Sequence, residues 1–124
     1  MHWAAQYVGR PWTPESHCWS FFRLIQAEHY ARSVPIINVD TSNQRAILHE
    51  INTNPERRRW KEVDRPKDGD GVLMSRNTRL AHVGVYVDVD GGRILHCDNA
   101  GVLLQSEVSL RMFWPKVTWW TPCF

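Results

Sequence analysis

The segment 80–87 constrains the fold most, because its side chains separate into two unlike sets. In an extended strand, successive side chains point to opposite faces of the sheet. One set is small and apolar and consists of Ala81, Val83, Val85 and Val87. The other set consists of His82, Gly84 and Tyr86. This alternation favours a β-strand whose apolar face is buried.

The glycine on the face of His82 indicates a close approach by another element. Gly84 follows His82 by two residues and therefore shares its face. Because glycine has no side chain, the space beside the imidazole is open to a neighbouring element. We expect that element to be a helix that begins at Cys18.

Periodicity predicts helices in the first part of the chain and strands in the second. Residues 18, 21, 22 and 25 follow helical spacing and predict a helix over 18–32, capped by Ser16 or His17. Other helices are predicted at 2–8, 43–52 and 55–62. Strands are predicted at 71–76, 80–87, 93–97, 101–105 and 112–120. This order is typical of an α+β domain in which N-terminal helices pack on an antiparallel sheet, here of about five strands.

Length and composition indicate one globular domain, 1–124. The chain has 124 residues, seven of them tryptophan, and 43% of its residues are hydrophobic, which excludes a disordered chain. A net charge of +2 without a basic stripe gives no sign of nucleic-acid binding. No apolar run approaches the roughly 18 residues that a membrane span needs. The first residues lack the features of a signal peptide, and three cysteines fit a reducing compartment.

Cys18 is the first candidate for chemistry. At the start of a helix, the dipole and the free backbone N–H groups stabilise a thiolate, and we expect a lowered pKa there. His82, if it lies opposite, would activate the thiol as a nucleophile. The alternative is structural, because free cysteines are often small buried residues and lone strand histidines usually have a structural role.

The turn after the strand 80–87 decides whether His96 reaches His82. A five-residue turn, 88–92, sets His96 opposite Gly84 and diagonal to His82, at roughly 7 Å between β-carbons. The same register sets Asp98 directly opposite His82. A turn at 90–92 would move His96 out of reach, and we expect the longer one. Geometry alone leaves His96 and Asp98 as candidates for the partner of His82.

Five short motifs occur in order along nearly the whole chain. They are Tyr7-Val-Gly-Arg-Pro11, Cys18-Trp-Ser-Phe-Phe22, Pro66-Lys-Asp-Gly-Asp70, His82-Val-Gly-Val-Tyr86 and Arg93-Ile-Leu-His96. Together they resemble the NlpC/P60 family of cysteine peptidases, in the tryptophan-bearing form of phage tail proteins. The resemblance implies a papain-like fold, with Cys18 as nucleophile, His82 as general base and His96 as the residue that orients it. It implies hydrolysis of peptidoglycan peptides, as an endopeptidase or amidase, without metal or cofactor.

Several positions depart from the family pattern. The aspartate before the cysteine is His17 here, and Trp12, which has no hydroxyl, stands for the family's active-site tyrosine. Tyr7 is the candidate substitute, and backbone N–H groups at the helix start are candidate donors to the oxyanion. Tyr7, Trp12, His17 and Asp98 are therefore possible auxiliary residues.

Other functions and partners remain open. The chain is alternatively a non-catalytic component of a phage tail tip or baseplate, with Trp114, Trp119 and Trp120 at an interface or in the core. A third interpretation makes Cys18, His82 and His96 zinc ligands. The first two place the protein among tail proteins, in the virion or, before assembly, in the host cytoplasm. We expect Cys97 and Cys123 to be free thiols, with Cys97 pointing away from the site.

Overall fold

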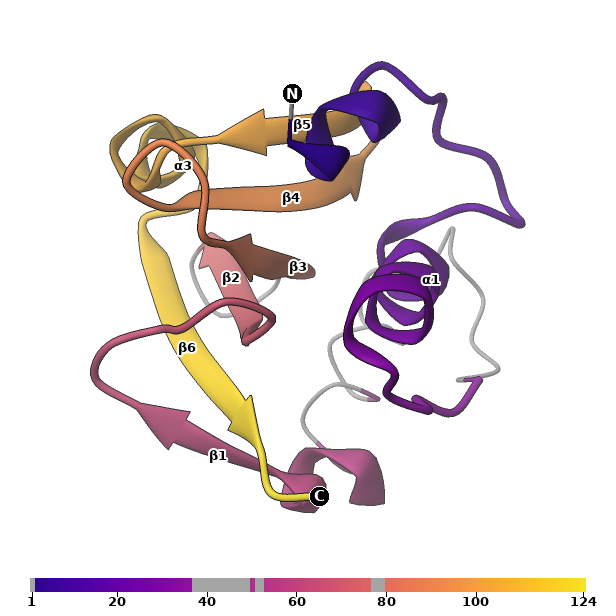
Figure 1. Cartoon of the computed structure of the whole chain (residues 1–124), viewed down its shortest axis with the longest axis vertical. Helices are drawn as coiled ribbons and strands as arrows, with labels where there is room; N and C mark the ends of the chain where they lie inside the picture. The colour runs from indigo at the N-terminus through magenta and orange to yellow at the C-terminus, as the bar shows by residue number, and fades with distance from the viewer. Residues whose placement is uncertain (1, 37–49, 51–52, 77–79) are drawn as a thin grey trace.

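The computed structural model describes residues 2–36, 50, 53–76 and 80–124, with only the backbone at 80 and 81. Its elements in chain order are η1 (Trp3–Tyr7), α1 (Cys18–Tyr30), η2 (Pro55–Arg59), β1 (Trp60–Val63), β2 (Gly71–Arg76), β3 (Leu80–Val87), β4 (Arg93–Asp98), β5 (Gly101–Gln105), α3 (Glu107–Phe113) and β6 (Lys116–Pro122) (Figure 1). The elements η1 and η2 are 3₁₀ helices. The six strands form one antiparallel sheet in the order β1-β6-β2-β3-β4-β5. The predicted α+β class is confirmed. None of the helices in the described ranges has the length and hydropathy that crossing a bilayer requires.

Two elements differ from the sequence prediction. The helix expected at 55–62 shortens to η2, and β1 begins at Trp60 because that segment pairs with β6. The strand expected at 112–120 begins at Lys116 because α3 precedes it. The Ser106 hydroxyl caps α3 by accepting from the N–H of Ser109 at 3.2 Å. The helix expected at 2–8 is the 3₁₀ helix η1, and the helix expected at 43–52 lies almost wholly outside the described residues.

The helices α1 and α3 lie on opposite sides of the sheet (Figure 1). Below α1, the core includes Phe21, Phe22, Ile25, Val83, Val85, Val87, Leu95 and Cys97. On the other side, it consists of Val72, Met74, Ile94, Leu110, Val117 and Trp119. The valine stripe of β3 therefore faces α1.

The expectation that α1 packs on the face of Gly84 is wrong. That face is filled by β4, since a β-carbon at Gly84 would lie 3.0 Å from the β-carbon of His96 and 3.1 Å from Cγ2 of Ile94. The helix instead covers the valines, because burying that stripe removes more apolar surface from water than covering the face of His82 and Gly84 would. Gly84 thus permits close approach of a neighbouring strand and not of the helix.

The register between β3 and β4 confirms the five-residue turn. Val87 pairs with Arg93 and Val85 pairs with Leu95, so the turn spans 88–92. Asp90 and Gly91 have positive φ values of 50° and 81° there, which glycine adopts readily and aspartate tolerates. Among the described residues, the pairing of β3 with β4 ends at Val85, although both strands continue.

Candidate functional site

Cys18 is the first residue of α1, as the sequence predicted. His17 occupies the N-cap position, and its N–H donates to the Ser20 hydroxyl at 2.9 Å. The Cys18 side chain is half-buried and packs against the apolar core below α1. The sulfur therefore lies between the helix start and the valine face of β3.

Burial raises the pKa of the Cys18 thiol to about 11. Backbone hydrogen bonding from Val83 lowers this pKa in part, and the neighbouring Cys97 raises it further. The expected lowering of the pKa by the helix start is wrong for this structure. The physical reason is that removing water from a thiolate outweighs the favourable backbone N–H groups.

His82 and His96 contact one another across β3 and β4. Nε2 of His82 lies 2.9 Å from Nδ1 of His96, and Nε2 of His96 lies 2.7 Å from Oε1 of Gln105. Both rings are buried, and burial lowers both pKa values, with the charge of His96 as a further cause at His82. The ring of His82 also stacks on Trp114, with centroids 5.0 Å apart and planes at 10°. The site therefore holds two neutral imidazoles at neutral pH.

Of the two candidate partners of His82, His96 is the one that contacts it, as the resemblance implied. Asp98 uses its Oδ1 to accept from the N–H of Ala100 at 2.8 Å. Its negative charge raises the pKa of His96 in opposition to burial, which remains the larger effect. Asp98 thus acts on the pair through its charge.

Cys18 and His82 lie on opposite faces of β3. Cys18 packs on the face of Val83. His82 lies on the other face, which it shares with Gly84, and stacks on Trp114. Within the described part of the chain, the two side chains form no hydrogen bond with each other. The Cys18 thiol lies beside Val83, and the neighbouring residue of β3, His82, carries the imidazole. The thiol and the imidazole are therefore near the same part of β3 but do not touch.

Cys97 lies on the face of Cys18. Its thiol donates to the carbonyl oxygen of Ser16 at 3.5 Å, just before α1 begins. Cys97 points away from His96, as expected. The expectation that it points away from the whole site is wrong, because it shares the face of Cys18. The reason is the same alternation, which sends His96 to the face of α3 and Cys97 to the face of α1. Cys18, Cys97 and Cys123 are free thiols.

Tyr7 and Trp12 make no polar contact with the candidate catalytic side chains among the described residues. The Tyr7 hydroxyl donates to Oε2 of Glu28 at 2.6 Å and lies 2.8 Å from Nε2 of His29, while burial raises its pKa to about 12. Trp12 is half-buried against the core below α1. Among the described contacts, neither residue hydrogen-bonds to Cys18. Tyr7 is therefore not placed as a substitute for the tyrosine of the family pattern.

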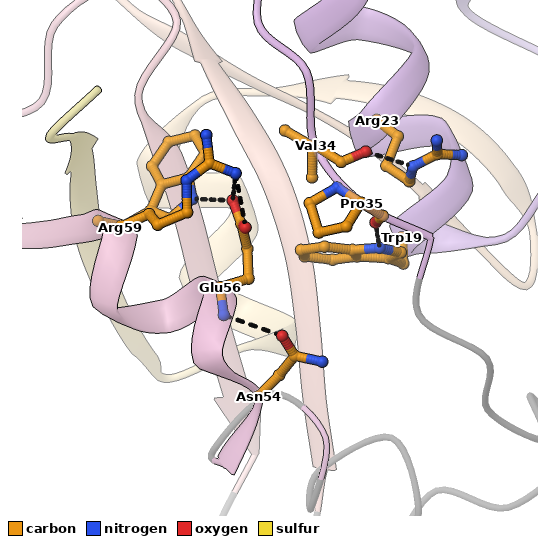
Figure 2. A network of polar contacts seen from close by, with 8 residues as sticks. Trp19, Arg23, Val34, Pro35, Asn54, Glu56 and Arg59 are labelled. Atoms are coloured by element: carbon orange, nitrogen blue, oxygen red, sulfur yellow. Dashed lines mark hydrogen bonds and ion pairs between the residues drawn. The ribbon is translucent and has the colours of Figure 1, made fainter.

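A cavity with aromatic walls adjoins the start of α1 and opens to solvent. Its lining includes four aromatic side chains, Trp19, Phe22, Trp60 and Trp120, together with Val83. Figure 2 shows polar contacts of two lining residues: Trp19 donates from Nε1 to the carbonyl oxygen of Pro35 at 2.9 Å, and Glu56 forms an ion pair with Arg59 at 3.0 Å. Sequence reasoning missed this cavity, because its walls come from segments far apart in the chain.

A zinc site is not formed by the predicted residues. The described residues contain no group of three His, Cys, Asp or Glu side chains that could hold a metal ion, so Cys18, His82 and His96 do not converge on one. The tryptophans near the C-terminus take part in the fold: Trp119 is buried, Trp114 stacks on His82 and Trp120 lines the cavity. The chain matches no protein-family model and no curated protein.

Proposed function

We propose that the protein is a cysteine hydrolase of the NlpC/P60 type with a papain-like fold, which cleaves peptides of bacterial peptidoglycan as an endopeptidase or amidase. The observation that carries the proposal is a pair of features in one fold. Cys18 begins a helix, and His82 contacts His96 in the register that the resemblance requires. The ordered motifs supply the remaining support.

In this proposal Cys18 is the nucleophile, His82 the general base and His96 the residue that orients it. With a pKa of about 11, Cys18 is a neutral thiol at rest. Its proton must therefore leave as the sulfur attacks the substrate carbonyl, and a neutral imidazole is the group that accepts it. Because Cys18 and His82 lie on opposite faces of β3, this transfer requires the backbone of β3 around His82 to rearrange in the substrate complex. Beyond Val85, the described parts of β3 and β4 do not pair with each other, although β3 remains paired with β2 and β4 with β5.

The aromatic cavity beside Cys18 supports the enzymatic proposal. Trp19 follows Cys18 directly, and Val83 both lines the cavity and contributes its backbone to the surroundings of the thiol. A substrate group held there would bring its scissile bond close to the sulfur.

Two observations favour a second function. The raised pKa of Cys18 and its lack of contact with His82 are what a non-catalytic relative would show. Under this alternative, the protein is a structural component of a phage tail tip or baseplate. Both candidates place it with tail proteins, in the virion or, before assembly, in the host cytoplasm.

Incubation with purified peptidoglycan sacculi separates the two functions. We expect wild-type protein to release peptide fragments that mass spectrometry identifies, and Cys18→Ala to release none. Cys123→Ala is the matched control, because it removes an exposed thiol near the C-terminus. Intact sacculi after incubation with folded wild-type protein, or equal release by Cys18→Ala, would favour the structural component.

A further inference from the structure

Three side chains form a hydrogen-bonded series across three neighbouring strands. Gln105 on β5 contacts His96 on β4, which contacts His82 on β3, at 2.7 Å and 2.9 Å. In the register of β4 with β5, Leu103 lies opposite His96, so Gln105 is two residues further along on the same face. Its side chain reaches back diagonally to the imidazole.

The chemistry of the first contact gives the series a direction. Oε1 of Gln105 is a carbonyl oxygen and only accepts hydrogen bonds. Nε2 of His96 must therefore carry a hydrogen. A neutral imidazole has one N–H, so Nδ1 of His96 is an acceptor, and Nε2 of His82 must donate to it. This leaves Nδ1 of His82 without a hydrogen.

The surroundings of the pair keep this assignment unique. Both rings are buried in the neutral form, so neither carries a second N–H. The stack of His82 on Trp114, with planes at 10°, fixes the plane of the ring from the other side of the site. A rotation that exchanged the two nitrogens of His82 would break its hydrogen bond to His96.

We propose that Gln105 is a positioning residue, which acts through His96 to hold His82 as the Nε2–H tautomer and to leave Nδ1 as its basic nitrogen. The role of Nδ1 as the atom that accepts the Cys18 proton rests on the proposed function. The tautomers themselves do not, because they follow from the hydrogen bonds of the resting protein. The glutamine side chain is what the role needs, since it combines the reach with an accepting oxygen.

Nitrogen-15 NMR of the histidine side chains in the wild-type protein is the direct test. At a pH where both rings are neutral, we expect His82 and His96 as Nε2–H tautomers. Finding His82 as the Nδ1–H tautomer would overturn the proposal, since the glutamine would then donate through its amide group. This measurement needs no variant and no substrate.

Two substitutions test whether Gln105 is responsible. Gln105→Glu keeps an accepting oxygen and should leave both tautomers as in wild type. Gln105→Met keeps the length but has no acceptor, and should lower the ratio of Nε2–H to Nδ1–H in His96 roughly fivefold, the size that one net hydrogen bond supports. Gln6→Met, the same change at an exposed position, is the control. An unchanged ratio in folded Gln105→Met would overturn the assignment to Gln105.

Kinetics on a soluble muropeptide separate this proposal from the proposed function. Gln105→Met should lower kcat several-fold with KM unchanged, and Gln105→Glu should retain most of the rate. If the wild type cleaves nothing while the tautomers are as expected, the proposed function fails and the tautomer assignment stands. If hydrolysis is normal in Gln105→Met, the positioning role fails while the hydrolase stands.

Discussion

Burial acts on the titrating side chains of the candidate site so that each favours its neutral form. It raises the pKa of Cys18 to about 11 and lowers the pKa values of His82 and His96. A carboxylate, Asp98, stands near His96 and opposes burial only in part. The resting protein therefore has no thiolate–imidazolium pair.

Alkylation of Cys18 should be slow in the resting protein. A thiol with a pKa of about 11 has a far smaller thiolate fraction at pH 7 than an ordinary cysteine with a pKa of about 8.5. We expect iodoacetamide to modify Cys18 more than roughly tenfold more slowly than a cysteine peptide. Peptide mapping by mass spectrometry from pH 6 to 10 measures this, and Cys18→Ala identifies the signal. A Cys18 that reacts faster than the peptide at pH 6 would contradict the prediction.

Acid should destabilise the fold through the histidine pair. The pKa values of His82 and His96 lie below the ordinary 6.5, so below that pH the unfolded chain binds protons that the folded chain does not. The free energy of unfolding is then at its full value above pH 6.5. It falls with decreasing pH, by up to about 1.4 kcal/mol per pH unit for each ring.

Urea unfolding between pH 8 and pH 5 measures this dependence. His82→Gln removes one of the two buried rings, and the fall in the free energy of unfolding per pH unit should become shallower in that variant. A wild-type midpoint that stays level from pH 7 to pH 5 would contradict the expected linkage.

The strand β3 serves a different partner on each of its faces. Its valines pack below α1, and on its other face His82 contacts His96 of β4 and Trp114 after α3. The contact with β4 depends on Gly84, because only the missing side chain allows His96 to lie so close. The position of the imidazole pair is thus a property of two strands together.

Gly84→Ala should therefore disturb the pair. The new β-carbon would lie 3.0 Å from the β-carbon of His96 and 3.1 Å from the carbonyl oxygen of Leu95, tighter than ordinary contact. We expect a loss of about 1–3 kcal/mol in the free energy of unfolding, as for overpacked cores. Gly71→Ala on β2 is the matched control, since its β-carbon would meet Phe22 at an ordinary 3.5 Å. Chemical denaturation compares the free energies of unfolding of the two variants. Equal values would contradict the prediction and show that β4 shifts to accommodate the new β-carbon.

At the scale of the whole molecule, the last strand of the chain lies inside the sheet. β6 pairs with β1 on one edge and with β2 on the other, through partners such as Val63 and Val72, which both lie opposite Trp119. Figure 1 shows β6 passing between β1 and β2, with the C-terminus beside η2. The sheet is therefore completed only by residues near the C-terminus.

Hydrogen exchange should follow this arrangement. The backbone of β6 is bonded on both sides, whereas β1 and β5 are the edge strands. We expect the amides of β2, β3 and β6 to exchange most slowly and those of β1 and β5 faster. Exchange followed by NMR in the native protein tests this order. Fast exchange at Trp119, together with slow exchange in β5, would contradict the sheet order.

Local pattern alone predicted several parts of the fold. The alternation in 80–87, the helix start at Cys18 and the five-residue turn were each predicted from spacing, because each depends on neighbours in the chain. That register left His96 and Asp98 as candidate partners of His82, and the family resemblance favoured His96, which makes the contact. The Ser106 cap of α3 was also readable from its residues, although the prediction assigned 106–111 to no element and began a strand at 112.

Only the tertiary structure decided which face of β3 receives α1. Alternation separates the valines from His82, but it does not say which side a distant helix covers. That choice depends on the apolar area buried when the whole sheet is assembled. The same holds for β1, whose pairing with β6 joins segments about 60 residues apart. The chemistry of Cys18 depends on this choice, because burial below α1, and not its place in the helix, sets its pKa.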